Sequence, residues 1–408
     1  MRTLGLVVAE YRTVDNVAGG LDSVAQFILN AFTAEHGWAV QVASPRMSRR
    51  APESRRLLSP RSWLVVKQRQ EVIDGVVVTH FGAPLAEVEV ARYAPRRSLT
   101  TFLDACDAVL VIAGSPAIAQ ATRRTERPVV LQVATFAAEE RAELIRRQRG
   151  VRRVATSMMT RLVARLDESA LKLVDIVLVE NEELYAACLR RGVNARLIAP
   201  GVDCELFHAG EKSHRPGQIV AVGRWGDPRK DLETLLRAYA LARHRHGVRH
   251  RLVLAGVEEP TPEHKSLITS LDLENDVDIL HDLSSVDLAG LYRTSDLFAL
   301  TSTEEGLGLV FLEAMASGVP VVATATAGAR YAMGDLETGE LVDFGPDLDV
   351  RFAATLGSWC SDPERRARAG IEARQNVEHR FDSRDMGAQF RAVIEELLPR
   401  IPGAGVLH

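Results

Sequence analysis

The chain has 408 residues, of which 46% are hydrophobic and 25% charged, with a formal net charge of −4. This length exceeds one ordinary hydrophobic core and fits two α/β domains, and the composition is that of a soluble globular protein. The cysteines (Cys106, Cys188, Cys204 and Cys360) show no CxxC spacing. Their scatter argues against a disulfide framework or a structural zinc site, and favours a reducing compartment.

The N-terminal stretch MRTLGLVVAE is a short apolar run that predicts a first strand rather than a signal peptide. Since no apolar run is long enough to span a bilayer, we expect a cytoplasmic protein. Charge is unevenly placed: residues 1–200 carry 28 Lys and Arg against 21 Asp and Glu, and the remainder carries 22 against 33. This asymmetry indicates different partners for the two halves, or two ordinary solvated surfaces.

The first half of the chain alternates strands and helices. Residues 3–9 predict a strand, which is followed by a loop ending in Gly19-Gly20, a helix from about Leu21 to Glu35 and the strand WAVQVAS. This order is typical of a nucleotide-type α/β unit. Gly20 then either forms a tight turn or lets the backbone approach a ligand bound between domains.

Two arginine-rich segments interrupt this alternation. Residues 46–70 predict a long surface loop, after which come the strands GVVVTHF, DAVLVIAG and PVVLQVATF. Residues 139–172 are also basic, and their second part carries Met158, Leu162 and Leu166 at helical spacing. We favour an ordinary amphipathic helix; the alternative is a helix that lies on an anionic membrane surface or presents arginines to an anionic acceptor.

The first α/β half closes with one more strand and helix before a second half begins. The strand DIVLVE leads to Asn181, which we expect to cap the helix EELYAACLRRG. A fresh strand, QIVAVG, then starts another alternating series with a helix over Lys230–His246, so we expect two doubly wound parallel sheets and a cleft between them. The predicted organisation is a first domain (1–200), a linker (201–217), a second domain (218–380) and a C-terminal helix and tail (381–408).

The stretch Thr303–Thr324 reads TEEGLGLVFLEAMASGVPVVAT and places seven residues between Glu305 and Glu313. Its pattern predicts a glycine-containing loop, a buried helix stopped by Gly318 and a short buried parallel strand. A loop that enters a helix N-terminus suits a phosphate. A carboxylate in so apolar a helix is costly unless hydroxyls or a cation satisfy it, and the simpler alternative for Glu313 is a cap or a salt bridge.

The segment GRWGDPRKD directly follows the strand QIVAVG. It places Arg224 and Lys230 at the mouth of the second sheet, where Arg can grip a phosphate bidentately and Lys adds a mobile charge. Arg229 is either a third cation or an exposed side chain. The alternative for the whole segment is a solvated turn before a helix.

The segment EGLGLVFLEAMASGVPVVAT resembles the Glu–seven residues–Glu signature of the retaining glycosyltransferases of family 4. GRWGDPRKD is similar to the phosphate-binding Arg and Lys of that family. DIVLV together with ARLIAPGVDCELF resembles the domain-closing segment of that family, and the early pair Gly19-Gly20 resembles its glycine loop. The resemblance covers nearly the whole chain. It implies the GT-B fold: two Rossmann-like domains facing a central cleft, and a final helix that crosses back to the first domain.

The same resemblance implies roles for the quoted residues. Glu305 would contact the hydroxyls of the transferred sugar, Glu313 would bind the ribose, and Arg224 and Lys230 would neutralise the departing diphosphate. Backbone groups would approach the donor at Gly20, Leu307, Gly308 and Leu309.

The implied reaction is retaining transfer of a hexose-type sugar from a nucleotide-diphospho-sugar to an acceptor hydroxyl. We expect neither a cofactor nor a metal, because the chain offers no convincing DxD motif, and the DLD at 347–349 reads as surface. The expected partners are the donor and an unidentified acceptor, without nucleic acid. The basic first domain gives a candidate peripheral contact with an anionic membrane.

One departure from the family concerns a histidine that often follows a strand of the first domain. The corresponding stretch VVLQVATF offers Ala134 and Thr135 instead. Two alternatives therefore stay open: a sugar-nucleotide epimerase that needs no acceptor, and a catalytically weak GT-B binding subunit.

Overall fold

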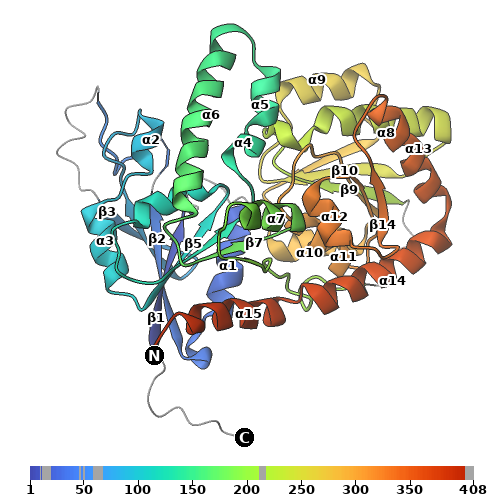
Figure 1. The fold of residues 1–408 in the computed structure, drawn as a ribbon. Helices are drawn as coiled ribbons and strands as arrows, with labels where there is room; N and C mark the ends of the chain where they lie inside the picture. The colour runs from blue at the N-terminus through green and yellow to red at the C-terminus, as the bar shows by residue number, and fades with distance from the viewer. Residues whose placement is uncertain are drawn as a thin grey trace, which may run out of the picture.

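The computed structural model describes residues 1–9, 11, 20–45, 47–48, 51–57, 68–210 and 217–399. It contains two open sheets, each covered by helices, which belong to the first and second halves of the chain (Figure 1). The α/β class expected from the sequence is confirmed.

Within the described residues, the first sheet has eight strands in the order β3-β4-β2-β1-β5-β6-β7-β8. Its strands are β1 (Arg2–Val8), β2 (Trp38–Pro45), β3 (Gln68–Ile73), β4 (Val76–Phe81), β5 (Ala108–Ala113), β6 (Val129–Val133), β7 (Ile176–Val179) and β8 (Ala195–Leu197). Every residue of β5, β6 and β7 is buried, as expected for central parallel strands covered on both faces.

The edge of this sheet corrects two predictions. β3 runs antiparallel to β4, so the sheet is not wholly parallel, and it begins inside the segment expected to be a surface loop. Ala51, Glu53 and Ser54 of the same segment are buried: a Cβ on Gly82 would lie 1.8 Å from the carbonyl oxygen of Glu53. The sequence QRQEVI hid this strand because an exposed edge strand shows little apolar alternation. Arg46, Arg49, Arg50 and residues 58–67 of the predicted loop lie outside the described residues.

Six described strands form the second sheet, all parallel, in the order β11-β10-β9-β12-β13-β14. They are β9 (Gln218–Val222), β10 (Arg251–Gly256), β11 (Val277–His281), β12 (Leu297–Leu300), β13 (Val321–Thr324) and β14 (Gly339–Val342). The predicted buried strand that follows Pro320 is therefore confirmed as β13.

The helices of the first half are α1 (Gly20–Ala31), α2 (Glu89–Arg92), α3 (Arg97–Asp104), α4 (Ala137–Glu140), α5 (Ala142–Arg147), α6 (Gly150–Ala170) and α7 (Glu182–Arg190). Those of the second half are α8 (Leu232–His246), α9 (Pro262–Ser270), α10 (Ser285–Arg293), α11 (Leu309–Ala316), α12 (Ala327–Met333), α13 (Leu348–Ser361), α14 (Pro363–Arg380) and α15 (Ser383–Glu396). Short 3₁₀ turns cover Ala34–His36, Pro116–Thr122 and Pro228–Lys230. Lys230 thus stands just before α8 rather than inside it.

The last helix, α15, returns to the first half of the chain and packs against α1 (Figure 1). The rings of Phe27 and Phe390 meet edge to face with centroids 5.4 Å apart. Where the chain crosses, Val202 pairs with Asp382 in an isolated bridge. The expected crossing of the C-terminal helix back to the first domain is confirmed.

Within the described residues, the helices are too short or too polar to cross a bilayer.

Candidate functional site

The carboxyl ends of β9 and β12 bring the two sequence motifs together. Lys230, in the turn after β9, places its Nζ 2.5 Å from Oε1 of Glu305, in the loop after β12. Ser302 Oγ donates a hydrogen bond of 2.6 Å to the same oxygen. Because β9 and β12 are neighbours in a parallel sheet, residues 75 positions apart meet at one edge.

The arginines of GRWGDPRKD have different surroundings. Arg229 is largely buried and bonds both Asp227 and Glu304, the latter at 2.8 Å. Burial alone would raise the pKa of Asp227, but the bonds from Arg229 hold that pKa below its ordinary value. Arg224 reaches Asp227 at 3.2 Å, and its side chain is 48% exposed. Arg229 is therefore occupied by the protein itself, whereas Arg224 is open to a ligand.

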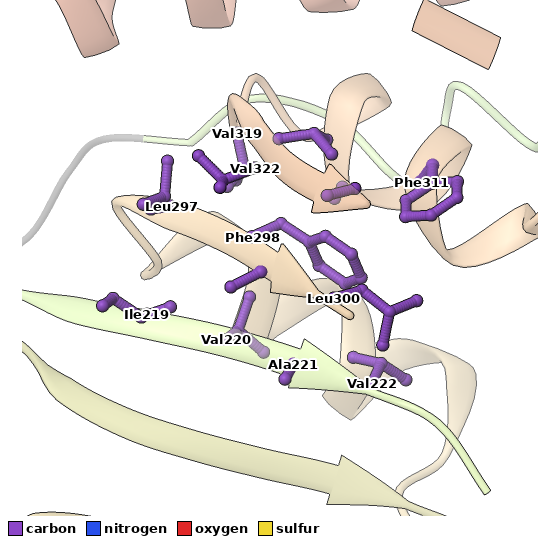
Figure 2. Close-up of a cluster of buried hydrophobic side chains, with 14 of the residues drawn as sticks. Ile219, Val220, Ala221, Val222, Leu297, Phe298, Leu300, Phe311, Val319 and Val322 are labelled. Carbon is purple, nitrogen blue, oxygen red and sulfur yellow. The ribbon is translucent and has the colours of Figure 1, made fainter. Parts of the chain in front are cut away.

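The loop that enters α11 depends on Gly308. Its φ is +74°, and a Cβ there would lie 2.6 Å from Cδ2 of Phe311. Phe311 in turn packs edge to face on Phe298 of β12, with centroids 5.7 Å apart, and Figure 2 shows this ring between α11 and the strands. The packing fixes the start of α11 against the sheet.

Glu313 is the charged residue of α11, among the buried Phe311, Leu312 and Ala314. The hydroxyl of Tyr292 donates to its Oε2 at 3.0 Å, and burial raises the pKa of Glu313 to about 7. The buried carboxyl of Glu313 is therefore hydrogen-bonded by a hydroxyl, which offsets part of the free-energy cost of burying it.

The first domain contributes a buried carboxyl, that of Glu180, which the sequence did not identify as part of the site. Glu180 follows β7 directly, is 4% exposed and accepts a hydrogen bond from Gln132 of β6. Burial raises its pKa to about 8, and the charges of Glu304 and Glu305 act in the same direction. The available signal was a carboxylate directly after the buried strand IVLV.

The two halves touch at Gly306. A Cβ on this residue would lie 2.3 Å from the carbonyl oxygen of Ala134 and 2.8 Å from Oε2 of Glu180. Asn181 caps α7 as predicted, accepting from the backbone of Leu184 at 2.9 Å, and also donates to the Gly306 carbonyl at 2.7 Å. The loop after β12 is therefore held by groups from both sheets.

Ala134 and Thr135 stand in the stretch where the resemblance anticipates a histidine. Thr135 is buried; burial raises the pKa of Glu304 above its ordinary value, and the nearby hydroxyl of Thr135 acts in the opposite direction. In this stretch a hydroxyl rather than an imidazole therefore lies near the loop that carries Glu304.

Two of the remaining predicted donor contacts, Leu307 and Leu309, belong to this loop and the start of α11, and the third, Gly20, belongs to the first domain. Leu307 is buried, and Leu309 packs against both the core of the second sheet and the cluster that includes Leu21 of α1. Gly20 opens α1, is exposed, and has room for a Cβ. Its partner in the glycine pair, Gly19, lies outside the described residues.

Other surface features do not join this site. One pocket is lined by Phe32, Trp38 and Val40 with their neighbours, and another by residues 122–123 and 125–129 with Leu173 and Asp175. In the part of the chain that the structure describes, no group of three or more His, Cys, Asp or Glu side chains is placed to hold a metal ion.

Two facing Rossmann-like sheets with a returning C-terminal helix define a GT-B glycosyltransferase architecture. Residues 205–376 match the family model described as glycosyl transferases group 1, so the resemblance to family 4 is confirmed in the part of the chain that carries both motifs.

Solved structures share the fold over nearly the whole chain. A sucrose-phosphate synthase from Thermosynechococcus elongatus is 19% identical, with a TM-score of 0.71 over 97% of this chain and 99% of that one. Anabaena HepE in complex with UDP and glucose is 18% identical, with a TM-score of 0.68 over 97% and 100% of the two chains.

Curated relatives are more similar over shorter stretches. A D-inositol 3-phosphate glycosyltransferase of Kribbella flavida is 32% identical over 257 residues, 58% of this chain and 57% of the relative. An MMP alpha-(1->4)-mannosyltransferase of Mycolicibacterium hassiacum is 31% identical over 206 residues, 50% and 49%. The chain spans about half the length of the curated relatives it matches.

Proposed function

We propose that this protein transfers a hexose-type sugar from a nucleotide-diphospho-sugar to an acceptor hydroxyl, with retention of anomeric configuration. The observation that carries the proposal is the contact of Lys230 with Glu305, beside the open Arg224 and the start of α11. The names of the curated relatives, which include a glycosyltransferase and a mannosyltransferase, support the reaction class. UDP-containing structures of HepE and of the pneumococcal transferase GtfA support a nucleotide-sugar donor.

In this proposal Arg224 and Lys230 bind the diphosphate and stabilise the negative charge that develops as it departs. Two cations held by the protein can supply this stabilisation without reorganising during the reaction. Lys230 can contact the diphosphate because its present partner, the carboxylate of Glu305, lies beside the proposed position of the sugar. When donor binds, its ammonium can face both Glu305 and a phosphate oxygen.

Glu305 then contacts the sugar hydroxyls, and Glu313 the ribose hydroxyls. Glu313 suits this role because it is held by a neutral hydroxyl and keeps an acceptor oxygen for a ligand. The backbone of Leu307, Gly308 and Leu309 approaches the sugar and diphosphate, and Gly20 approaches from the first domain.

The chemistry in this proposal needs neither a cofactor nor a metal, because side chains and the start of α11 stabilise the leaving group. Its acceptor is a hydroxyl of a glycan, a lipid-linked compound or a small molecule, bound on the first-domain side of the cleft.

The test has two stages. A thermal-shift screen with UDP, GDP, ADP and dTDP identifies the nucleotide, and the matching sugar donors are then incubated with and without an acceptor panel. We expect release of the nucleoside diphosphate to require both the sugar donor and an acceptor, the product to keep the donor's anomeric configuration, and the rate to be unchanged by EDTA. An isomerised donor without acceptor would indicate an epimerase, and binding without turnover a binding subunit; either would overturn the proposal.

A further inference from the structure

The α5–α6 hairpin projects from the first domain, and its far end is the start of α6 (Figure 1). The later part of α6 is anchored to the first domain: Asp167 accepts from the backbone of Ala117 and Ala137 at 2.8 and 2.9 Å. Thr160, Val163 and Ala170 are the other buried residues of the helix. The first turns, residues 150–155, are exposed on all sides.

An apolar stripe runs along the free face of α6. Val151, Val154, Met158 and Leu162 are 85%, 60%, 60% and 44% exposed. Their spacing of three, four and four residues places them on one face, and that face is opposite the buried one. No other part of the described chain covers this stripe. Contiguous exposed apolar surface is typical of an interaction site, so the stripe indicates a binding partner.

The charges around the stripe select the occupant. Residues 149–166 contain five arginines and no acidic residue. Arg161 and Arg165 follow Met158 and Leu162 by three residues and therefore flank the stripe, whereas the other three lie on other sides of the exposed first turns. Two copies of this face in a symmetric dimer would bring like charges together. An anionic bilayer surface offers both an apolar layer for the stripe and phosphate groups for the arginines.

We propose that the free face of α6 binds an anionic lipid surface, with Val151, Val154, Met158 and Leu162 inserted among the headgroups and the arginines on lipid phosphates. The hairpin also reaches the donor side of the molecule, since Arg147 contacts Asp231 and Glu233 at 3.3 Å. Binding by α6 would therefore hold the cleft at the bilayer surface.

The proposal is tested by cosedimentation of the full chain with vesicles of phosphatidylcholine alone or with about one third phosphatidylglycerol. We expect binding only to the anionic vesicles, with partitioning that weakens as salt rises. The pair Val154→Asp and Met158→Asp should lower partitioning at least about tenfold, and so should the pair Arg161→Glu and Arg165→Glu, whose side chains flank the stripe.

Controls come from exposed residues of α14, where Ile371 is 61% exposed and Arg368 lies at the surface. Ile371→Asp and Arg368→Glu should leave partitioning unchanged, and circular dichroism should show native helix content in all variants. Equal partitioning of all variants would overturn the proposal. So would absence of binding to anionic vesicles, or a dimer of the wild type that the Val154/Met158 variant abolishes. The readout is lipid binding alone, so it does not depend on donor or acceptor.

Discussion

Among the carboxyls around the loop after β12, Glu180 has the pKa that burial raises most clearly. It is buried beside Gln132, and its pKa of about 8 compares with 4.5 for an ordinary glutamate. Between these two pH values the folded protein holds a proton that the unfolded chain releases. The free energy of unfolding therefore falls as pH rises through this window, by about 1.4 kcal/mol per pH unit for one such group.

Glu180→Gln should remove this contribution because the amide does not titrate. Urea unfolding at pH 5, 6.5 and 8 should show the variant losing less stability than the wild type as pH rises. Asp167 and Glu313 also have raised pKa values, so the informative quantity is the difference between the two proteins. Parallel stability curves would contradict the assignment of a proton to Glu180.

Glu305 offers a test that separates sugar contact from nucleotide binding. Glu305→Gln keeps the side-chain shape but loses the ion pair with Lys230. We expect donor turnover to fall about 100-fold while the Kd of the nucleoside diphosphate changes less than about threefold, because the carboxylate faces the sugar. Glu274→Gln, at an exposed position after α9, is the matched control. A turnover within about twofold of the wild type would remove Glu305 from the mechanism.

The loop after β12 is the element that joins the two domains. Gly306 lies against backbone of the first domain, so Gly306→Ala should force the two sheets apart rather than shift a flexible side chain. We expect donor turnover to fall about 100-fold, because the site residues of the second domain would no longer be correctly placed relative to the first domain. The unfolding temperature should change little.

Gly290→Ala provides the comparison, since a Cβ there meets only the end of the Arg293 side chain at 3.7 Å. Normal activity of both glycine variants would show that contact at Gly306 is not needed for turnover.

At the scale of the whole molecule, α15 fastens the end of the chain to the first domain. Phe390 is fully buried against Phe27, so Phe390→Ala should lower the free energy of unfolding by about 3–5 kcal/mol. Urea unfolding measures this loss, and Ile371→Ala, at an exposed position of α14, should change the free energy of unfolding by less than about 0.5 kcal/mol. Equal stability of the two variants would mean that α15 docks without stabilising the first domain.

The parts of this architecture that the sequence could predict are those carried by local patterns. Apolar strands followed by glycines gave the order of elements, and Asn181 showed itself as a cap by its place before a helix. The edge strand β3 could not be predicted, because its mostly exposed residues are polar and show no strand-like alternation of apolar side chains. Glu180 and Thr135 could not be predicted as neighbours of the loop after β12, because this loop belongs to the other domain. No local sequence spacing encodes a contact between domains.

The central claim is that Arg224 and Lys230 bind the diphosphate of a nucleotide sugar in this cleft. Isothermal titration of UDP, GDP, ADP and dTDP into the wild type, Arg224→Ala, Lys230→Ala and the control Lys265→Ala tests it most directly. Lys265 is an exposed lysine of α9 paired with Glu259. We predict that at least one diphosphate binds the wild type, that each of the two cleft variants weakens it about tenfold or more, and that the control does not. Affinities that are unchanged in both cleft variants, or no binding of any diphosphate, would contradict the claim.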